Sequence, residues 1–165
     1  MRAMQKRLSP AVKKGVVEGM SGTCGGFELL PHTADIMVRA KGRSIEEAFS
    51  NAAVGMYEVM TSVASIEPLE DREVVAEGFD LENLLYNFLE NLLVLLDTEG
   101  FLVSRVKSLR ISKTEEGYRL TAVVSGERFS PDKHESRVLV KAITYHEMRI
   151  YREDNCYVVE YVPDI

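Results

Sequence analysis

Two segments of the chain carry apolar residues at the spacing of a helix. From residue 45 to residue 60 the apolar side chains recur every three or four positions, and Ser44 begins a capping box before them. A second series, from residue 81 to about residue 97, has a broader apolar face, with Asp80 suited to cap its start and Gly100 to end it. The sequence therefore predicts two amphipathic helices, and the second should be the central helix of the core.

Most of the other patterned segments alternate between apolar and polar residues, as strands do. Polar turn residues at 115–117 and 153–155 separate pairs of these segments into hairpins. The predicted strands lie at residues 36–41, 72–79, 103–113, 118–127, 138–151 and 157–162. Strands and helices alternate first and further strands follow, so the predicted class is α+β, with two helices packed on one face of a mixed, largely antiparallel β-sheet.

The first 26 residues differ in charge from the rest of the chain. They hold five basic residues and one acidic residue, a charge of +4, and the whole chain carries −6, which leaves −10 for residues 27–165. We expect residues 1–26 to be a basic, disordered extension and residues 27–165 to form a single domain. An acidic domain does not favour strong direct binding to nucleic acid, and it suits cations or a basic protein partner.

The sequence shows no secretory leader, no apolar run long enough to span a membrane, and only two cysteines, Cys24 and Cys156. We therefore expect a cytoplasmic protein with reduced thiols, in which Cys156 packs in the core. The spacings typical of zinc ligands and of phosphate-binding glycine loops are absent from the sequence. A monomer is the expected state.

Three carboxyl groups stand at the ends of predicted strands. Asp35 precedes the strand at 36–41, and Asp164 and the terminal carboxylate of Ile165 follow the strand at 157–162. If these two strands were antiparallel neighbours, the three groups would converge, and a hard divalent cation would offset their mutual repulsion. The alternative is that Asp35 caps a turn and Asp164 is a solvated end residue, and the sequence alone leaves both open.

Lys141 lies inside an apolar predicted strand, in the run VKAITYH. A lysine in this position either extends its charged end to water at a sheet edge or contacts a partner or an anion. The polar loop at 125–136 that precedes it is a candidate recognition surface.

The sequence resembles the archease family over residues 27–165. The motifs that carry the resemblance are HTADI at 32–36, SIEEAFSNAAVGMYEVM at 44–60, DLENLLYNFLENLLVLLDTEG at 80–100, GERFSPDKH at 126–134, VKAITYH at 140–146 and PDI at 163–165. The resemblance implies a protein that is not an enzyme and that activates the tRNA-splicing RNA ligase of the RtcB type by promoting its guanylylation and turnover.

The resemblance also implies a site. Its metal ligands would be Asp35, Asp164 and Ile165, with calcium as the expected ion and magnesium or manganese as alternatives. Lys141 matches a position on which the family depends, and His32, His134 and His146 lie in matching motifs, so these four residues are expected on the surface that meets the partner.

Two other functions stay open at this stage. One is a chaperone-like or tRNA-binding modulator of tRNA modification, with a tRNA methyltransferase as its partner. The other is a metal-dependent hydrolase that acts alone, because clustered carboxylates with a bound cation can activate water.

Overall fold

The computed structural model of the chain describes residues 13–15, 24–33 and 35–165, with backbone alone described at 13–15. The elements, in chain order, are β1 (Lys13–Gly15), β2 (Phe27–His32), β3 (Asp35–Gly42), α2 (Ile45–Met60), η1 (Val63–Ser65), β4 (Glu70–Gly78), α3 (Leu81–Glu99), β5 (Phe101–Thr114), β6 (Gly117–Arg128), β7 (Arg149–Glu153) and β8 (Cys156–Tyr161). No helix in these described ranges is long and apolar enough to cross a membrane.

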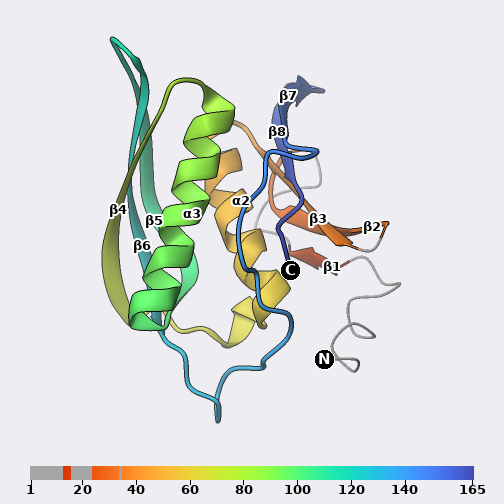
Figure 1. The fold of residues 1–165 in the computed structure, drawn as a ribbon, viewed down its shortest axis with the longest axis vertical. Helices are drawn as coiled ribbons and strands as arrows, with labels where there is room; N and C mark the ends of the chain where they lie inside the picture. The colour runs from red at the N-terminus through yellow and green to blue at the C-terminus, as the bar shows by residue number, and fades with distance from the viewer. Residues whose placement is uncertain (1–12, 16–23, 34) are drawn as a thin grey trace.

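The strands form two sheets, and every strand pair among the described residues is antiparallel. One sheet has the order β1-β2-β3-β8-β7 and the other has the order β4-β6-β5. Figure 1 shows the two helices between the sheets, with the three-stranded sheet on one side and the five-stranded sheet on the other. The α+β class and the two helices are confirmed, whereas the predicted single mixed sheet is replaced by two antiparallel ones.

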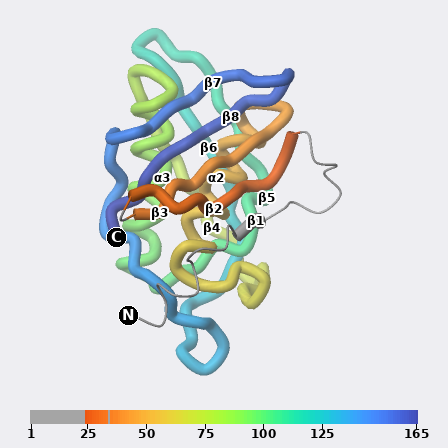
Figure 2. The backbone as a smooth tube through the Cα atoms, turned by 90° about the vertical axis from the view of Figure 1, so that its right-hand side faces the viewer, coloured from red at the N-terminus to blue at the C-terminus, as the bar shows by residue number. Residues whose placement is uncertain are grey.

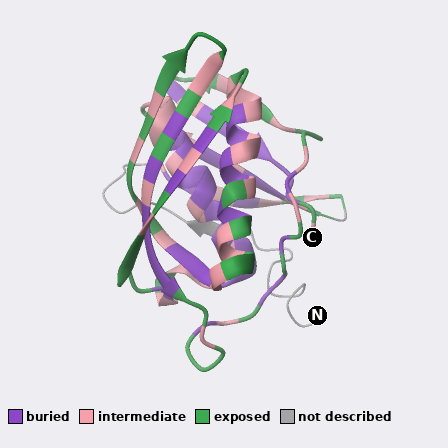
Figure 3. Ribbon diagram, turned by 60° about the vertical axis from the view of Figure 1, so that its left-hand side comes forward, coloured by how far each residue is buried: buried purple, intermediate pink, exposed green. Residues whose placement is uncertain are grey.

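The burial of helix α2 on opposite sides accounts for the presence of two sheets. Ten of its residues are buried, and it packs against β3 and β8 of one sheet and against β5 of the other. A Cβ atom at Gly55 would lie 2.8 Å from Val38 Cγ1, so glycine lets this helix lie close against β3. Helix α3 keeps an outward face, where Figure 3 shows exposed and half-buried residues. A helix that is buried on opposite sides requires a layer on each of them.

Both helix boundaries follow the predicted caps. The Ser44 side chain accepts a hydrogen bond from the N–H of Glu47 at 3.1 Å, and Asp80 accepts one from the N–H of Asn83 at 2.7 Å. Gly100 ends α3 in the left-handed conformation, with φ of +65°. These local signals therefore predicted the helices correctly.

The strand predictions fail in two places. The sequence analysis missed β2, and the strand predicted at 138–151 is wrong except for β7 at its end. Residues 137–148, here called the strap, are irregular apart from one bridge between Ala142 and Asp164. Figure 1 shows the strap rising past α3 toward β7. Its backbone groups form hydrogen bonds with several different elements, so it is not a strand of either sheet.

The prediction of reduced thiols is contradicted by a disulfide between Cys24 and Cys156, whose Cα atoms lie 5.4 Å apart. Cys156 is buried, as predicted. Cys24 falls in the predicted extension, as does β1, which pairs with β2. Most of residues 1–26 lie outside the described residues, and the prediction of disorder there stays a prediction.

Candidate functional site

The pairing of β3 with β8 brings Asp35 and Asp164 to the same end of the sheet. The two strands are antiparallel neighbours, and their pairing ends at Val38 opposite Tyr161. Asp35 lies three residues before Val38 and Asp164 three residues after Tyr161, so both lie beyond this end of the pairing. Both residues are exposed. The strand arrangement on which the predicted site depended is therefore present.

The strap holds the backbone around Asp164 in place. The N–H of Lys141 donates to the carbonyl oxygen of Asp164 at 2.7 Å, and the N–H of Asp164 donates to the carbonyl oxygen of Ala142 at 2.9 Å. The half-buried Ile165 packs against the hydrophobic core. Figure 2 shows this end of the chain at the same end of the sheet as the end of β2 and the beginning of β3. The last two residues thus lie on an anchored backbone between β3 and the strap.

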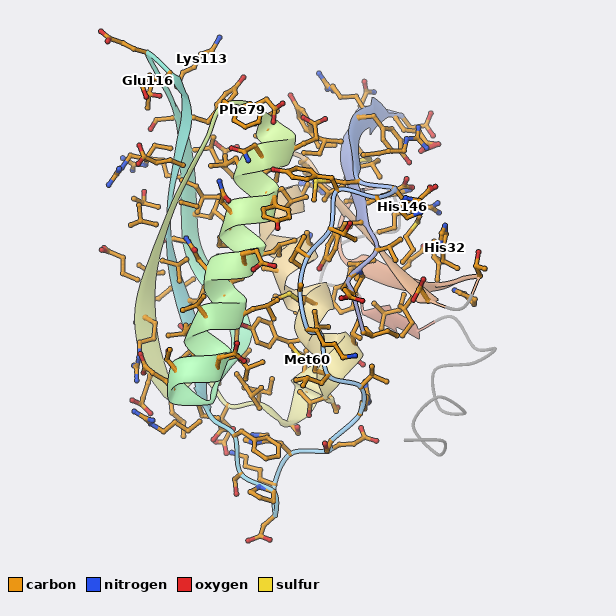
Figure 4. The ribbon with its side chains drawn as sticks, viewed as in Figure 1. His32, Met60, Phe79, Lys113, Glu116 and His146 are labelled. Atoms are coloured by element: carbon orange, nitrogen blue, oxygen red, sulfur yellow. A yellow bond between two sulfur atoms is a disulfide. The ribbon has the colours of Figure 1, made fainter. Side chains whose placement is uncertain are left out.

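Two of the predicted histidines meet beside this site. His32 pairs with Asp35 in the β2–β3 register, and its Nε2 lies 3.9 Å from one carboxylate oxygen of Glu147. The Nε2 of His146 lies 3.9 Å from the other oxygen of Glu147. Figure 4 shows His32 and His146 on the same side of the molecule. The structure therefore adds Glu147, which the sequence analysis missed and which only its position next to His146 could have indicated.

The Nδ1 atom of His32 is buried and has no hydrogen-bond partner among the described residues. A buried polar atom without a partner is uncommon and calls for an explanation. Because His32 stands beside Asp35, this nitrogen belongs to the same end of the sheet as the carboxylates.

Lys141 lies on the outer side of the strap and is exposed. Its backbone bond to Asp164 fixes the position from which the ammonium group extends. The lysine predicted for partner contact is therefore next to the predicted carboxylate site.

His134 does not lie on a surface, contrary to the expectation. Its ring is buried, its Nδ1 accepts a hydrogen bond from the N–H of Ser130 at 2.9 Å, and its Nε2 lies 3.0 Å from Glu127 Oε2. With Nδ1 accepting, the ring proton is on Nε2 and is donated to Glu127. His134 is occupied in closing its own loop.

The chemistry of the carboxylate site follows from its oxygen donors. Two aspartates and a main-chain carboxylate offer only oxygen ligands, which hard cations such as calcium, magnesium and manganese prefer. No group of three or more His, Cys, Asp or Glu side chains is arranged as a metal site in the described part of the chain. The expected ligand set uses two side chains and one terminal carboxylate, so it is a different kind of set, and it stays a prediction.

Comparison with known proteins gives a consistent result. The model of the archease protein family matches residues 27–165. The protein archease of Sulfurisphaera tokodaii is 49% identical over 139 residues, which are 84% of this chain and 98% of the relative. The protein archease of Thermococcus kodakarensis is 51% identical over 140 residues, with the same two coverages of 84% and 98%.

Solved structures extend the comparison to the fold. The solution structure of protein 1598 of Methanobacterium thermoautotrophicum has a TM-score of 0.73 and 38% identity, covering 85% of this chain and 99% of that one. The crystal structure of a Thermotoga maritima protein, described as an archease and possible chaperone, has a TM-score of 0.55 and 20% identity, covering 90% and 100%, and it shares the fold. From the family match, the relatives and the fold together, this chain belongs to the archease family.

Proposed function

We propose that this archease activates a tRNA-splicing RNA ligase of the RtcB type by promoting the guanylylation and turnover of that ligase, without catalysing a reaction itself. The observation that supports the proposal is the antiparallel β3–β8 pairing, which brings Asp35 and Asp164 to the same end of the sheet, beside the strap. The proposed setting is the cytoplasm.

In this proposal Asp35, Asp164 and the terminal carboxylate of Ile165 hold a divalent cation, with calcium as the favoured ion. When bound, the cation would supply positive charge to phosphate oxygens that enter the site. In this arrangement the three carboxyl groups would come together from β3 and from the end of the chain, and their mutual repulsion would favour an ion between them. The all-oxygen donor set and the freedom of a terminal carboxylate suit the loose coordination of calcium.

A lysine beside the carboxylates extends the proposed role to a nucleotide. Lys141 is exposed on the strap next to Asp164, and an ammonium group there can pair with a phosphate as a point charge. His32 and His146 lie close by, around Glu147. The site would thus offer both an acidic and a basic surface to a ligase that holds GTP and metal ions.

The test is the rate at which purified ligase becomes guanylylated in the presence of this protein, GTP and metal. Asp35→Asn and Asp164→Asn keep the size of the side chain and remove its charge, and each should lower the stimulation at least about tenfold, since a lost metal ligand costs that much or more. Both variants should also lose calcium affinity in calorimetric titration.

Asp154→Asn is the matched control, because Asp154 is an exposed aspartate in the β7–β8 turn, beyond the opposite end of β8. It should stimulate like the wild-type protein. If the Asp35 and Asp164 variants also stimulate like wild type, the proposed role of the carboxylates is wrong.

A further inference from the structure

A cavity of about 630 Å³ lies between the C-terminal ends of α2 and α3 and the beginning of the strap. Its walls are mostly apolar, and Met60, which is labelled in Figure 4, is one of the lining residues. The apolar lining residues are Met60, Leu96, Leu102, Phe129, Val138 and Leu139. The size and the lining are those of a site for a ligand or for an inserted side chain. Nothing in the carboxylate site uses this cavity.

One polar atom in the cavity wall has no partner. Thr61 lines the cavity and is 2% exposed, and its hydroxyl makes no hydrogen bond among the described residues. Leaving a buried hydroxyl unpaired is unfavourable. Rotation about χ1 exchanges the hydroxyl and the methyl group of a threonine, so the hydroxyl can turn toward an occupant that offers a polar atom. The cavity therefore favours an occupant that is apolar and brings one hydrogen-bonding group, as a peptide segment does.

The charge at the rim is negative. Arg137 is compensated by Glu58 at 2.9 Å and by Glu135 at 2.8 Å. Asp97, which is exposed on α3, forms no ion pair among the described residues. An uncompensated carboxylate beside an apolar cavity complements a segment in which a lysine or arginine stands next to an apolar residue.

The strap connects the cavity with the carboxylate site, because Leu139 lines the cavity and Lys141, two residues further on, is bonded to Asp164. Along the strap, Val138 and Val140 are buried while Leu139 and Lys141 are exposed. Two residues of extended chain span about 7 Å. Because Lys141 is bonded to Asp164, a partner that covers the carboxylate site reaches Leu139 with one more side chain.

We infer that this cavity is a second docking point for the ligase, which inserts an apolar side chain that is flanked by a basic residue. This inference rests on the proposed function above. The carboxylate site would act on the nucleotide chemistry of the ligase, and the cavity would determine how tightly the two proteins associate. The two sites should therefore affect different kinetic parameters.

The experiment measures the rate of ligase guanylylation as the concentration of this protein is raised. Leu139→Ser should raise the half-saturating concentration about tenfold and leave the maximal rate unchanged, because burial of a leucine side chain is lost only on association. Asp97→Lys should also raise the half-saturating concentration, since it reverses the rim charge. Leu139 and Asp97 are exposed in the free protein, so both variants should fold, as circular dichroism would check.

Leu69→Ser is the matched control, because Leu69 is a similarly exposed leucine that does not line the cavity, and it should behave as the wild type does. If the half-saturating concentration is the same for the wild type, Leu139→Ser and Asp97→Lys, the proposed docking point is wrong. The proposed function is not affected by that outcome. A lowered maximal rate with unchanged half-saturation also overturns the docking point. If the wild-type protein gives no stimulation, the proposed function fails and the inference fails with it.

Discussion

Glu127 anchors the loop that forms one end of the cavity. Its Oε2 accepts from the N–H of Glu67 at 2.7 Å and lies 3.0 Å from His134 Nε2, and its Oε1 accepts from Lys133 Nζ at 2.9 Å. Burial alone would raise the pKa of Glu127, but the three hydrogen bonds and the charge of Lys133 lower the pKa to about 2. The carboxylate therefore stays ionised while it holds both sides of the loop.

Replacing Glu127 by Gln should destabilise the protein at neutral pH. The amide keeps the shape but presents an NH₂ group and no negative charge to donors, which should lower the free energy of unfolding by about 1–3 kcal/mol. Urea unfolding at pH 7 measures this change. Glu116→Gln, at the exposed β5–β6 turn, is the control and should unfold like the wild type.

The pH dependence of that difference gives a second readout. The folded pKa of about 2 lies below the ordinary value of 4.5, so the unfolded chain takes up the proton first as the pH falls. The stabilisation from Glu127 is complete above about pH 4.5 and is lost as the pH falls toward 2. The difference between wild type and Glu127→Gln should shrink across this window. A constant difference down to pH 2.5 would mean that the charge of Glu127 has no part in the stability.

The role of Glu127 could not be predicted from the sequence. The partner residue Glu67 lies 60 residues away, and its contribution is a backbone N–H, which any residue type carries. His134, seven residues on, belongs to the same motif and was assigned to the surface on that basis. A motif shows which residues occur together, whereas burial decides whether they face a partner or each other.

At the scale of elements, the strap shows where pattern and backbone diverge. The alternation that predicted a strand is real, since Val138 and Val140 are buried and Leu139 and Lys141 are exposed. A sheet requires a neighbouring strand as well, and the backbone of the strap bonds instead to several elements. Those bonds run from Arg137 N–H to Met60, from Lys141 N–H to Asp164, and from Ile143 N–H to the carboxylate of Glu90. Alternation predicts the buried face of an extended segment but not its bonding partners.

The helices were predictable because their signals are local. Ser44 and Asp80 cap residues three positions away, and Gly100 ends α3 next to its own last residue. The strand order of the sheets depends on contacts between distant segments, so the sequence left it open. For this reason the sequence analysis predicted the carboxylate site only on the condition that the first and last strands are antiparallel neighbours.

Tyr145 is one of the residues that hold the strap on α3. Its ring stacks on that of Tyr86, with centroids 4.5 Å apart and planes at 9°, and its hydroxyl accepts from Asn83 Nδ2 at 2.6 Å. Tyr145→Ala should loosen the strap by about 1 kcal/mol or more. Hydrogen exchange should then be roughly five- to tenfold faster at the amides of Lys141, Ile143 and Asp164.

Tyr145→Phe separates the two contacts, because it keeps the stacking and removes only the bond from Asn83. Its exchange rates should lie close to those of the wild type. Unchanged protection of the three amides in Tyr145→Ala would show that the strap is held by its other bonds, such as that from Ile143 N–H to Glu90. Ligase stimulation by Tyr145→Ala should fall in parallel, since the strap also fixes the backbone of Asp164.

At the scale of the whole molecule, the residues of the candidate site come from the beginning and the end of the domain. Asp35 begins β3, Asp164 follows β8, and the intervening chain builds both helices and the second sheet. β8 pairs with β3 on one side and with β7 on the other, so the position of its end relative to Asp35 depends on the pairing of these distant segments. Anything that ties the ends of the domain together should therefore stabilise the site and the fold at once.

The disulfide between Cys24 and Cys156 makes such a tie, since it joins residues 132 positions apart. It connects the segment before β2 to the first residue of β8. Closing so long a loop restricts the unfolded chain, and removing the disulfide should lower the free energy of unfolding by about 2–5 kcal/mol. Urea unfolding of the wild-type protein with and without dithiothreitol measures this effect.

The double variant with Cys24→Ser and Cys156→Ser provides the control for that measurement. It should match the reduced wild type in stability and should not respond to dithiothreitol. The strap and the β3–β8 pairing hold the backbone at this end of the sheet without help from the disulfide. The variant should therefore still stimulate the ligase at temperatures where it is folded. If reduction leaves the free energy of unfolding unchanged, the disulfide does not constrain the fold, and strand pairing and core packing keep the ends of the domain together without it.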